Sequence, residues 1–174
     1  MKKTFLLTFI LILFLGVNAQ DKSTVKKVFT EKEIPNLTLK DIYGKSINVA
    51  DYGKNGKITV FSFWATWCSP CKKELNNISQ LYEFWVDDYD MELVAISVDD
   101  ARNTSKVKTY ANGQAWEYDV LLDDNEDLKR LMNFQTVPYT VLVDQKGKVV
   151  YTHSGYVEGD EYILEEKLKA LNNK

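Results

Sequence analysis

The sequence predicts a single α/β domain built around a central mixed β-sheet, and three observations lead to this prediction. Two nearly continuous apolar runs, at 58–65 and 91–98, have the composition of buried central strands. Apolar residues at helical spacing follow the first run and recur near the C-terminus. A chain of 174 residues, 45% of them hydrophobic, is long enough for one domain with its own core.

The N-terminus differs in composition from the rest of the chain. It has a basic start at 1–3, an apolar run at 5–15 and small residues at 17–19. This order is typical of a secretory signal peptide cleaved after Ala19. An uncleaved membrane anchor is the alternative, although the apolar run is shorter than the roughly 20 residues that span a bilayer. We therefore expect residues 1–19 to be a signal peptide and the mature protein to be exported to the periplasm.

The remaining chain divides into a flexible N-terminal segment at 20–33 and a folded domain at 34–174. The formal net charge is −3, and loss of the two lysines near the N-terminus makes the mature chain more acidic. The basic residues form no continuous stripe, so nucleic acid is not an expected partner. We expect a monomer.

The first half of the domain is predicted to hold a hairpin, a strand and a helix. Alternating residues on both sides of Gly44 predict an N-terminal β-hairpin with strands at 36–40 and 46–49. The strand at 58–65 leads to a helix from Pro70 to about Val86, and proline suits the first turn of a helix. The residues that would form the buried stripe of this helix are Leu75, Ile78, Leu81, Tyr82 and Trp85.

The second half of the domain continues the alternation and ends in a hairpin and a helix. The predicted elements are a strand at 91–98, short helices at 103–112 and 125–132, strands at 139–144 and 149–152, and an amphipathic helix at 161–171. The turn at 145–148 contains Gly147 and joins the last two strands.

The two cysteines, Cys68 and Cys71, lie between the strand at 58–65 and the helix that begins at Pro70. The C-x-x-C spacing alone arises by chance in on the order of one chain in a hundred, but its place between a strand and a helix is much more specific. A disulfide across so small a loop stabilises the fold little, which favours a redox role over a structural one. Zinc normally takes four ligands, and only the distant His153 could join the two thiols, so no metal site is expected.

The motif Trp67-Cys68-Ser69-Pro70-Cys71, in this order of elements, resembles the thioredoxin fold. The stretch at 61–68 resembles the active-site approach of exported TlpA/ResA-type thiol-disulfide oxidoreductases. The segment between the strand at 91–98 and Pro138 resembles the central insertion of that family, and the stretch at 137–147 resembles its cis-proline loop and hairpin. The resemblance covers nearly the whole mature chain.

The resemblance implies a disulfide reductase that acts by dithiol–disulfide exchange on disulfide-bearing or thiol-bearing exported proteins, for example during cytochrome c maturation. Such a protein needs a membrane-bound thiol electron donor. The Cys68–Cys71 disulfide would itself be the redox group, so no cofactor is expected.

The two cysteines receive different roles. Cys68 would be the attacking thiol, because a helix N-terminus favours the thiolate. Cys71 would then attack the Cys68 sulfur of the mixed disulfide and release the reduced substrate. The resemblance implies that the Val137–Pro138 bond is cis and that the Val137 backbone binds an extended substrate segment. Trp67 is expected on the substrate-facing rim.

Glu74 lies three residues after Cys71, on the same side of the predicted helix. One interpretation is a surface carboxylate that interacts with the helix dipole. The other is a proton acceptor for the thiols, since ResA-like proteins have a glutamate at this offset. Thioredoxins carry a buried aspartate six residues before the first cysteine, where this chain has Ser62, so Glu74 is the best candidate for the base.

Three aspartate pairs, at 87–88, 99–100 and 123–124, fall at the ends of predicted elements. Solvated caps and turns explain them better than calcium binding, because no twelve-residue ligand pattern is present. His153 is interpreted as an ordinary surface or half-buried residue, and Trp64 as a packing residue.

Two other functions stay open on the sequence. A peroxiredoxin-type peroxidase would normally carry threonine three residues before its reactive cysteine, whereas Thr66 is two before Cys68. A copper-chaperone-like binding module on the same fold would carry a histidine before the cis-proline strand, and the stretch at 131–136 has none.

Overall fold

The computed structural model describes residues 32–172, so the predicted signal peptide and nearly all of the predicted flexible segment lie outside the described residues. The first described residues are bonded to the turn of the C-terminal hairpin. The Val149 N–H donates to the Lys32 carbonyl at 2.9 Å, and Glu33 forms an isolated bridge with Lys148.

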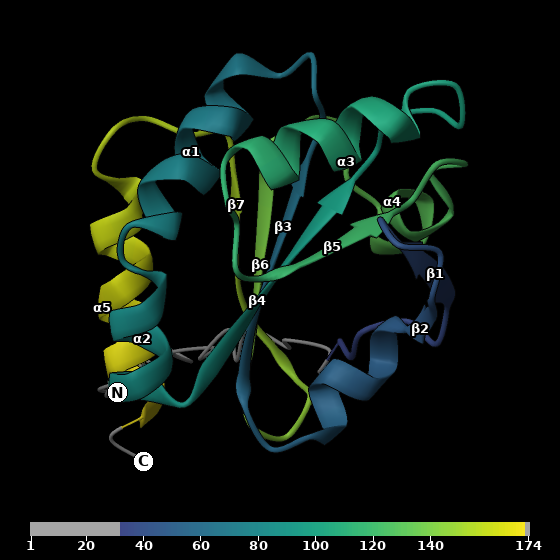
Figure 1. Ribbon diagram of the computed structural model, residues 1–174. Helices are drawn as coiled ribbons and strands as arrows, with labels where there is room; N and C mark the ends of the chain where they lie inside the picture. The colour runs from purple at the N-terminus through teal and green to yellow at the C-terminus, as the bar shows by residue number, and fades with distance from the viewer. Residues whose placement is uncertain (1–31, 173–174) are drawn as a thin grey trace, which may run out of the picture.

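The fold is a seven-stranded mixed sheet flanked by helices (Figure 1). The strands are β1 (Thr38–Asp41), β2 (Ser46–Asn48), β3 (Ile58–Trp64), β4 (Met91–Ser97), β5 (Asp119–Leu122), β6 (Tyr139–Val143) and β7 (Val149–Ser154). Their order across the sheet is β2-β1-β5-β4-β3-β6-β7. The helices are η1 (Val49–Lys54), α1 (Ser69–Ser79), α2 (Tyr82–Tyr89), α3 (Thr104–Gly113), α4 (Asp127–Met132) and α5 (Asp160–Asn172).

Strand β3 is the centre of the sheet. It pairs in parallel with β4 and antiparallel with β6, and all seven of its residues are buried. Burial on both faces explains why its sequence is a nearly continuous apolar run rather than an alternating one. The predicted α/β class, the N-terminal hairpin of β1 and β2, and the central mixed sheet are confirmed.

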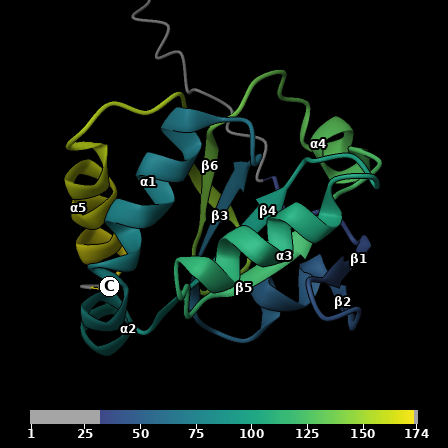
Figure 2. The same ribbon diagram turned by 45° about the horizontal axis from the view of Figure 1, so that its top comes forward.

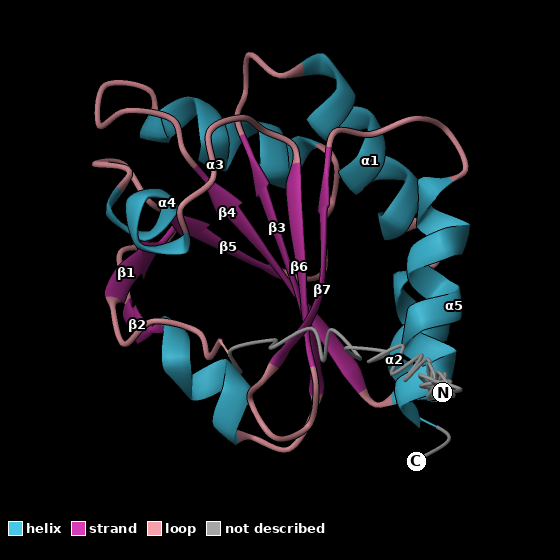
Figure 3. Cartoon of the chain, turned by 180° about the vertical axis from the view of Figure 1, so that it is seen from behind, coloured by secondary structure: helices cyan, strands magenta, loops and turns pink. Residues whose placement is uncertain are grey.

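Helices α1, α3 and α5 lie on the same face of the sheet, the face that carries Ser62. Asn76 of α1 donates to the Tyr110 hydroxyl of α3 at 3.2 Å, and Lys73 pairs with Glu158 just before α5. Seen from behind, the strands lie in front of α1 and α3 (Figure 3). The 45° turn in Figure 2 shows α1 beside α5 and α3 across β4 and β5.

The single helix predicted from Pro70 to Val86 is wrong: the chain forms two helices there. Helix α1 ends at Ser79, where the Gln80 and Leu81 N–H groups turn back to carbonyls three residues earlier, at 3.3 and 2.9 Å. The Ser79 hydroxyl donates to the Asn76 carbonyl at 2.8 Å and so competes with the helical bonds. The break lets Trp85 of α2 reach the core, where it is fully buried.

Strand β5 was not predicted. It has only four residues and includes Asp119, so the local pattern is weak. Its stability comes from its neighbours, because it pairs in parallel with β4 and antiparallel with β1. Through β5 the N-terminal hairpin is attached to the rest of the sheet.

Helix η1 was also not predicted. Among the described residues, no helix is long and apolar enough to cross a membrane.

Candidate functional site

The two cysteines form a disulfide at the N-terminus of α1. Cys68 is the N-cap residue, and its Sγ accepts the Cys71 N–H at 3.3 Å. Cys68 retains 5% of its exposure, whereas Cys71 is fully buried. Cys68 is therefore slightly more accessible to a substrate than Cys71, and the order of attack stays a prediction.

The turn that presents Cys68 is fixed by a buried aspartate. The Cys68 N–H donates to the Ala65 carbonyl at 3.0 Å and closes the turn after β3. Asp99 accepts the Thr66 N–H at 2.7 Å and the Thr66 hydroxyl at 2.6 Å. Asp99 is only 2% exposed, so the predicted solvated cap is wrong here. The Asp99 carboxylate can be buried because its oxygens accept hydrogen bonds from the turn at 65–68, which we call the thiol turn.

The two tryptophans next to the motif differ completely in exposure. Trp67 is 69% exposed beside Cys68, and Trp64 is fully buried. The Trp64 ring packs against Tyr110 and Trp116, with centroid distances of 5.7 and 4.9 Å. Trp64 is therefore a packing residue, as predicted, and Trp67 is available to a partner.

The Val137–Pro138 peptide bond is cis, as the resemblance implied. Tyr139 is paired with Phe63, near the end of β3, so Pro138 lies at the end of the sheet where the chain leads into Cys68. The Pro138 carbonyl accepts the Gly155 N–H at 2.9 Å. Among the described residues, none forms a backbone hydrogen bond with Val137. Its main chain is free to pair with an extended segment.

Glu74 is buried one helical turn below Cys71, with 4% of its surface exposed. Its Oε1 accepts the Thr140 hydroxyl at 2.7 Å, and its Oε2 accepts the Ser62 hydroxyl at 3.4 Å. Burial raises the pKa of Glu74 to about 7, although the two hydroxyl bonds oppose the rise. The surface interpretation of Glu74 is thus wrong, because the side chain points into the domain. At neutral pH this group can both take up and release a proton.

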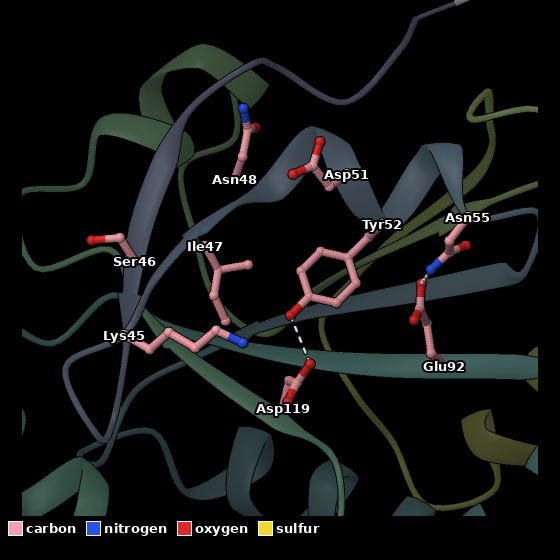
Figure 4. Close-up of a pocket in the computed structure, with 9 residues that line it drawn as sticks. All are labelled: Lys45, Ser46, Ile47, Asn48, Asp51, Tyr52, Asn55, Glu92 and Asp119. Atoms are coloured by element: carbon pink, nitrogen blue, oxygen red, sulfur yellow. Dashed lines mark hydrogen bonds between the residues drawn. The ribbon is translucent and has the colours of Figure 1, made fainter.

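A hollow lies away from the thiols (Figure 4). It has a volume of about 430 Å³ and is bordered by β2, η1 and the first residues of β4 and β5. Tyr52 donates to Asp119 across it at 2.7 Å, and Asn55 donates to Glu92 at 2.7 Å. Since β3 runs parallel to β4, these residues lie at the opposite end of the sheet from Cys68. Within residues 32–172, no group of three or more His, Cys, Asp or Glu side chains is arranged to hold a metal ion.

A thioredoxin-like sheet with a disulfide at the start of α1 and a cis-proline at the facing strand defines a thiol-disulfide oxidoreductase. Comparison with known proteins agrees. The model of the AhpC/TSA family matches residues 30–152, so the chain belongs to that family. ResA of Bacillus thuringiensis, a thiol-disulfide oxidoreductase, is 29% identical over 98% of this chain and 99% of its own length. ResA of Bacillus cereus is 30% identical over 86% of this chain and 82% of its own length.

Solved structures show the same fold. A thioredoxin-like protein from Porphyromonas gingivalis is 43% identical, with a TM-score of 0.72 over 80% of this chain and 92% of its own. A DsbE-type thiol:disulfide interchange protein from Chlorobium tepidum also has a TM-score of 0.72, over 82% of this chain and 96% of its own. Its identity is 23%, so that likeness concerns the fold. The resemblance to TlpA/ResA-type proteins is confirmed.

Proposed function

We propose that this protein is an exported disulfide reductase that acts on disulfide-bearing protein substrates. The observation that supports it best is a Cys68 that keeps 5% exposure beside a fully buried Cys71, with the buried carboxyl of Glu74 one helical turn further on. This arrangement separates an attacking thiol from a resolving thiol and gives the second one a proton acceptor.

In the proposed reaction, the Cys68 thiolate attacks a substrate disulfide and breaks its S–S bond: one substrate sulfur joins Cys68 in a mixed disulfide, and the other leaves as a thiolate and takes up a proton from solvent. The N-terminus of α1 stabilises this thiolate through unpaired N–H groups and the helix dipole. Cys71 gives its proton to the Glu74 carboxylate and attacks the Cys68 sulfur. The substrate thiolate leaves and takes up a proton, and the enzyme is left with the Cys68–Cys71 disulfide.

The substrate would lie across the face formed by Trp67, Val137 and Pro138. Trp67 offers an exposed apolar ring beside Cys68, and Val137, just before β6, has no backbone hydrogen bond to another described residue. An extended segment could pair with Val137 and place its disulfide over Cys68.

A trapping experiment tests the assignment of the two thiols. The Cys71→Ser variant should accumulate a mixed disulfide with a disulfide-bonded model protein, because the second attack is removed. The Cys68→Ser variant is the matched control and should trap nothing. Non-reducing gels followed by mass spectrometry would measure both. The opposite pattern, or trapping by both variants, contradicts the assignment.

The direction of the reaction is tested by the reduction potential in dithiothreitol or glutathione buffers. A potential near or below about −250 mV supports a reductase, and one near about −150 mV supports an oxidant or isomerase instead.

Export is proposed from the sequence at 1–19, with periplasmic localisation and a membrane-bound thiol as the electron donor. N-terminal sequencing of the protein from cells should find a chain that begins at Gln20. An intact N-terminus in the membrane fraction would instead indicate an anchor. Maturation of cytochrome c is one process that would use such a reductase, and loss of haem-bound cytochrome in a deletion strain is the test.

A further inference from the structure

The only histidine of this chain lines the same small cavity as Glu74. The cavity lies between α1, β6, β7 and α5, and its volume of about 10 Å³ is room for about one water. Glu74 is at its buried side, with 4% exposure. His153 and Asp160 line it as well, and their side chains are 36% and 16% exposed. The cavity therefore separates a buried carboxyl from a pair of groups that reach the solvent.

The sheet register brings these groups together. Thr140 of β6, whose hydroxyl donates to Glu74 at 2.7 Å, lies directly opposite His153 of β7. Opposite residues on paired antiparallel strands have Cβ atoms about 4.5–5.5 Å apart. The His153 Nε2 is 3.2 Å from Asp160 Oδ2, and this carboxylate also accepts the Val157 N–H at 2.8 Å. Asp160 is thus held in place and orients the imidazole ring.

The other acidic group at the cavity is already fully bonded. Glu161 of α5 is 6% exposed and accepts the Tyr156 hydroxyl at 2.8 Å, the Gly159 N–H at 3.0 Å and Asn77 Nδ2 at 3.3 Å. These three donors leave Glu161 a structural role at the start of α5.

The tyrosines near the cavity do not exchange protons at neutral pH. Tyr151 of β7 stacks on His153 with a centroid distance of 6.3 Å, and burial raises its pKa. Tyr118 lies next to α1, donates to the Leu75 carbonyl at 3.1 Å, and has its pKa raised by burial. The Nζ of Lys167 on α5 lies 5.7 Å from the centre of the Tyr151 ring.

We propose that one water in this cavity connects Glu74 to the His153–Asp160 pair, and that His153 is the group through which Glu74 exchanges protons with solvent. The inference rests on the proposed function, because the proton comes from the resolving thiol. Cys71 loses its proton to Glu74 as its sulfur attacks Cys68. Protonated Glu74 then gives a proton to the water, which gives one to the imidazole, and the imidazolium releases it to solvent. The electrons pass only from the cysteines to the substrate disulfide.

Imidazole suits this position because one of its ring nitrogens can accept a proton while the other releases one, so the ring can pass a proton from the water to solvent. The Thr140 hydroxyl keeps the Glu74 carboxyl turned towards the cavity wall that it shares with His153.

The test measures single-turnover reduction of a peptide disulfide by the reduced protein, followed by tryptophan fluorescence in weak buffer at pH 7. His153→Phe keeps a ring in place but removes the proton carrier, and the rate should fall about tenfold, less than the roughly 10²–10⁴-fold that a group acting directly on the reacting atoms contributes. His153→Ala should also be slow and should recover when imidazole is added. Tyr151→Phe is the matched control at the same cavity and should react like the wild type.

Two further measurements separate a proton path from a packing effect. In a Glu74→Gln background, His153→Phe should cause no additional loss of rate. The reduction potential of the Cys68–Cys71 pair should be unchanged in both His153 variants. A shifted potential, failure of imidazole to restore His153→Ala, or an equal loss in the Glu74→Gln background would overturn the proposal.

These outcomes are distinct from failure of the proposed function. If the wild-type dithiol does not reduce the peptide at all, the reductase assignment fails. If the wild type reduces it and both His153 variants keep its rate, only the proton path is refuted.

Discussion

Two carboxyl groups lie buried on different sides of the thiol turn, and they do different work. Asp99 is 2% exposed and Glu74 is 4% exposed, so burial does not separate them. Asp99 accepts a backbone N–H and the hydroxyls of Thr66 and Ser97, all within 2.8 Å. Among the described residues, Glu74 accepts hydrogen bonds from two hydroxyls, one of them at 3.4 Å. The comparison indicates that the number and kind of hydrogen-bond donors decide the role of a buried carboxyl. With three short bonds it stabilises a turn, and with fewer donors it can bind a proton.

The largest expected effect is the loss of stability in Asp99→Ala. The substitution leaves the Thr66 N–H and two hydroxyls without their acceptor, and each such group costs about 1–3 kcal/mol when buried. We expect a total loss of about 3–5 kcal/mol, measured by urea unfolding at pH 7. Asp100→Ala is the control, because the Asp100 carboxyl is next to Asp99 in the sequence but is exposed and pairs with Arg102. Equal losses in the two variants would show that the buried hydrogen bonds of Asp99 do not stabilise the turn before Cys68.

The second effect is a pH dependence of stability that Glu74→Gln abolishes. The pKa of Glu74 is about 7 in the folded protein against 4.5 in its reference state. Because the folded pKa is the higher one, this contribution to stability is complete below pH 4.5 and is lost as the pH rises to 7. The difference in unfolding free energy between Glu74→Gln and wild type should move by about 3 kcal/mol in favour of the variant over this range.

Urea unfolding at pH 4.5 and pH 8 would measure this change. The Asp99→Asn variant is the comparison, since it probes a carboxyl of the same burial on the other side of the turn. A Glu74→Gln curve parallel to that of the wild type would show that Glu74 does not hold a proton in the fold.

The smallest effect concerns the hydroxyls that bind Glu74. Thr140→Val removes the donor at 2.7 Å, which stabilises the ionised carboxylate. The pKa of Glu74 should therefore rise further, by about one unit for a bond worth about 1.5 kcal/mol. Carbon NMR of the labelled Glu74 carboxyl would measure it. Ser62→Ala should produce a smaller rise, because that bond is longer, and a fall in either variant would contradict the account of the donors.

Much of the fold could be predicted because its signals are local. The apolar runs of β3 and β4, the strand–cysteine–helix order and the turn at Gly147 depend on residues a few positions apart. The short β5 escaped prediction because four residues, one of them Asp119, carry too weak a pattern. The break between α1 and α2 escaped because the apolar stripe continues past it, and only the packing of Trp85 requires the change of direction.

The features of the candidate site also divide into those that the sequence predicted and those that only the structure showed. The sequence by itself determined the two thiols and their place before a helix, and it made Glu74 the candidate for a proton acceptor. Only the tertiary structure decided that Asp99 is buried under the thiol turn and that His153 shares a cavity with Glu74. The physical reason is distance along the chain. Thr140 is 66 residues from Glu74, and strand pairing alone places it between that carboxyl and His153.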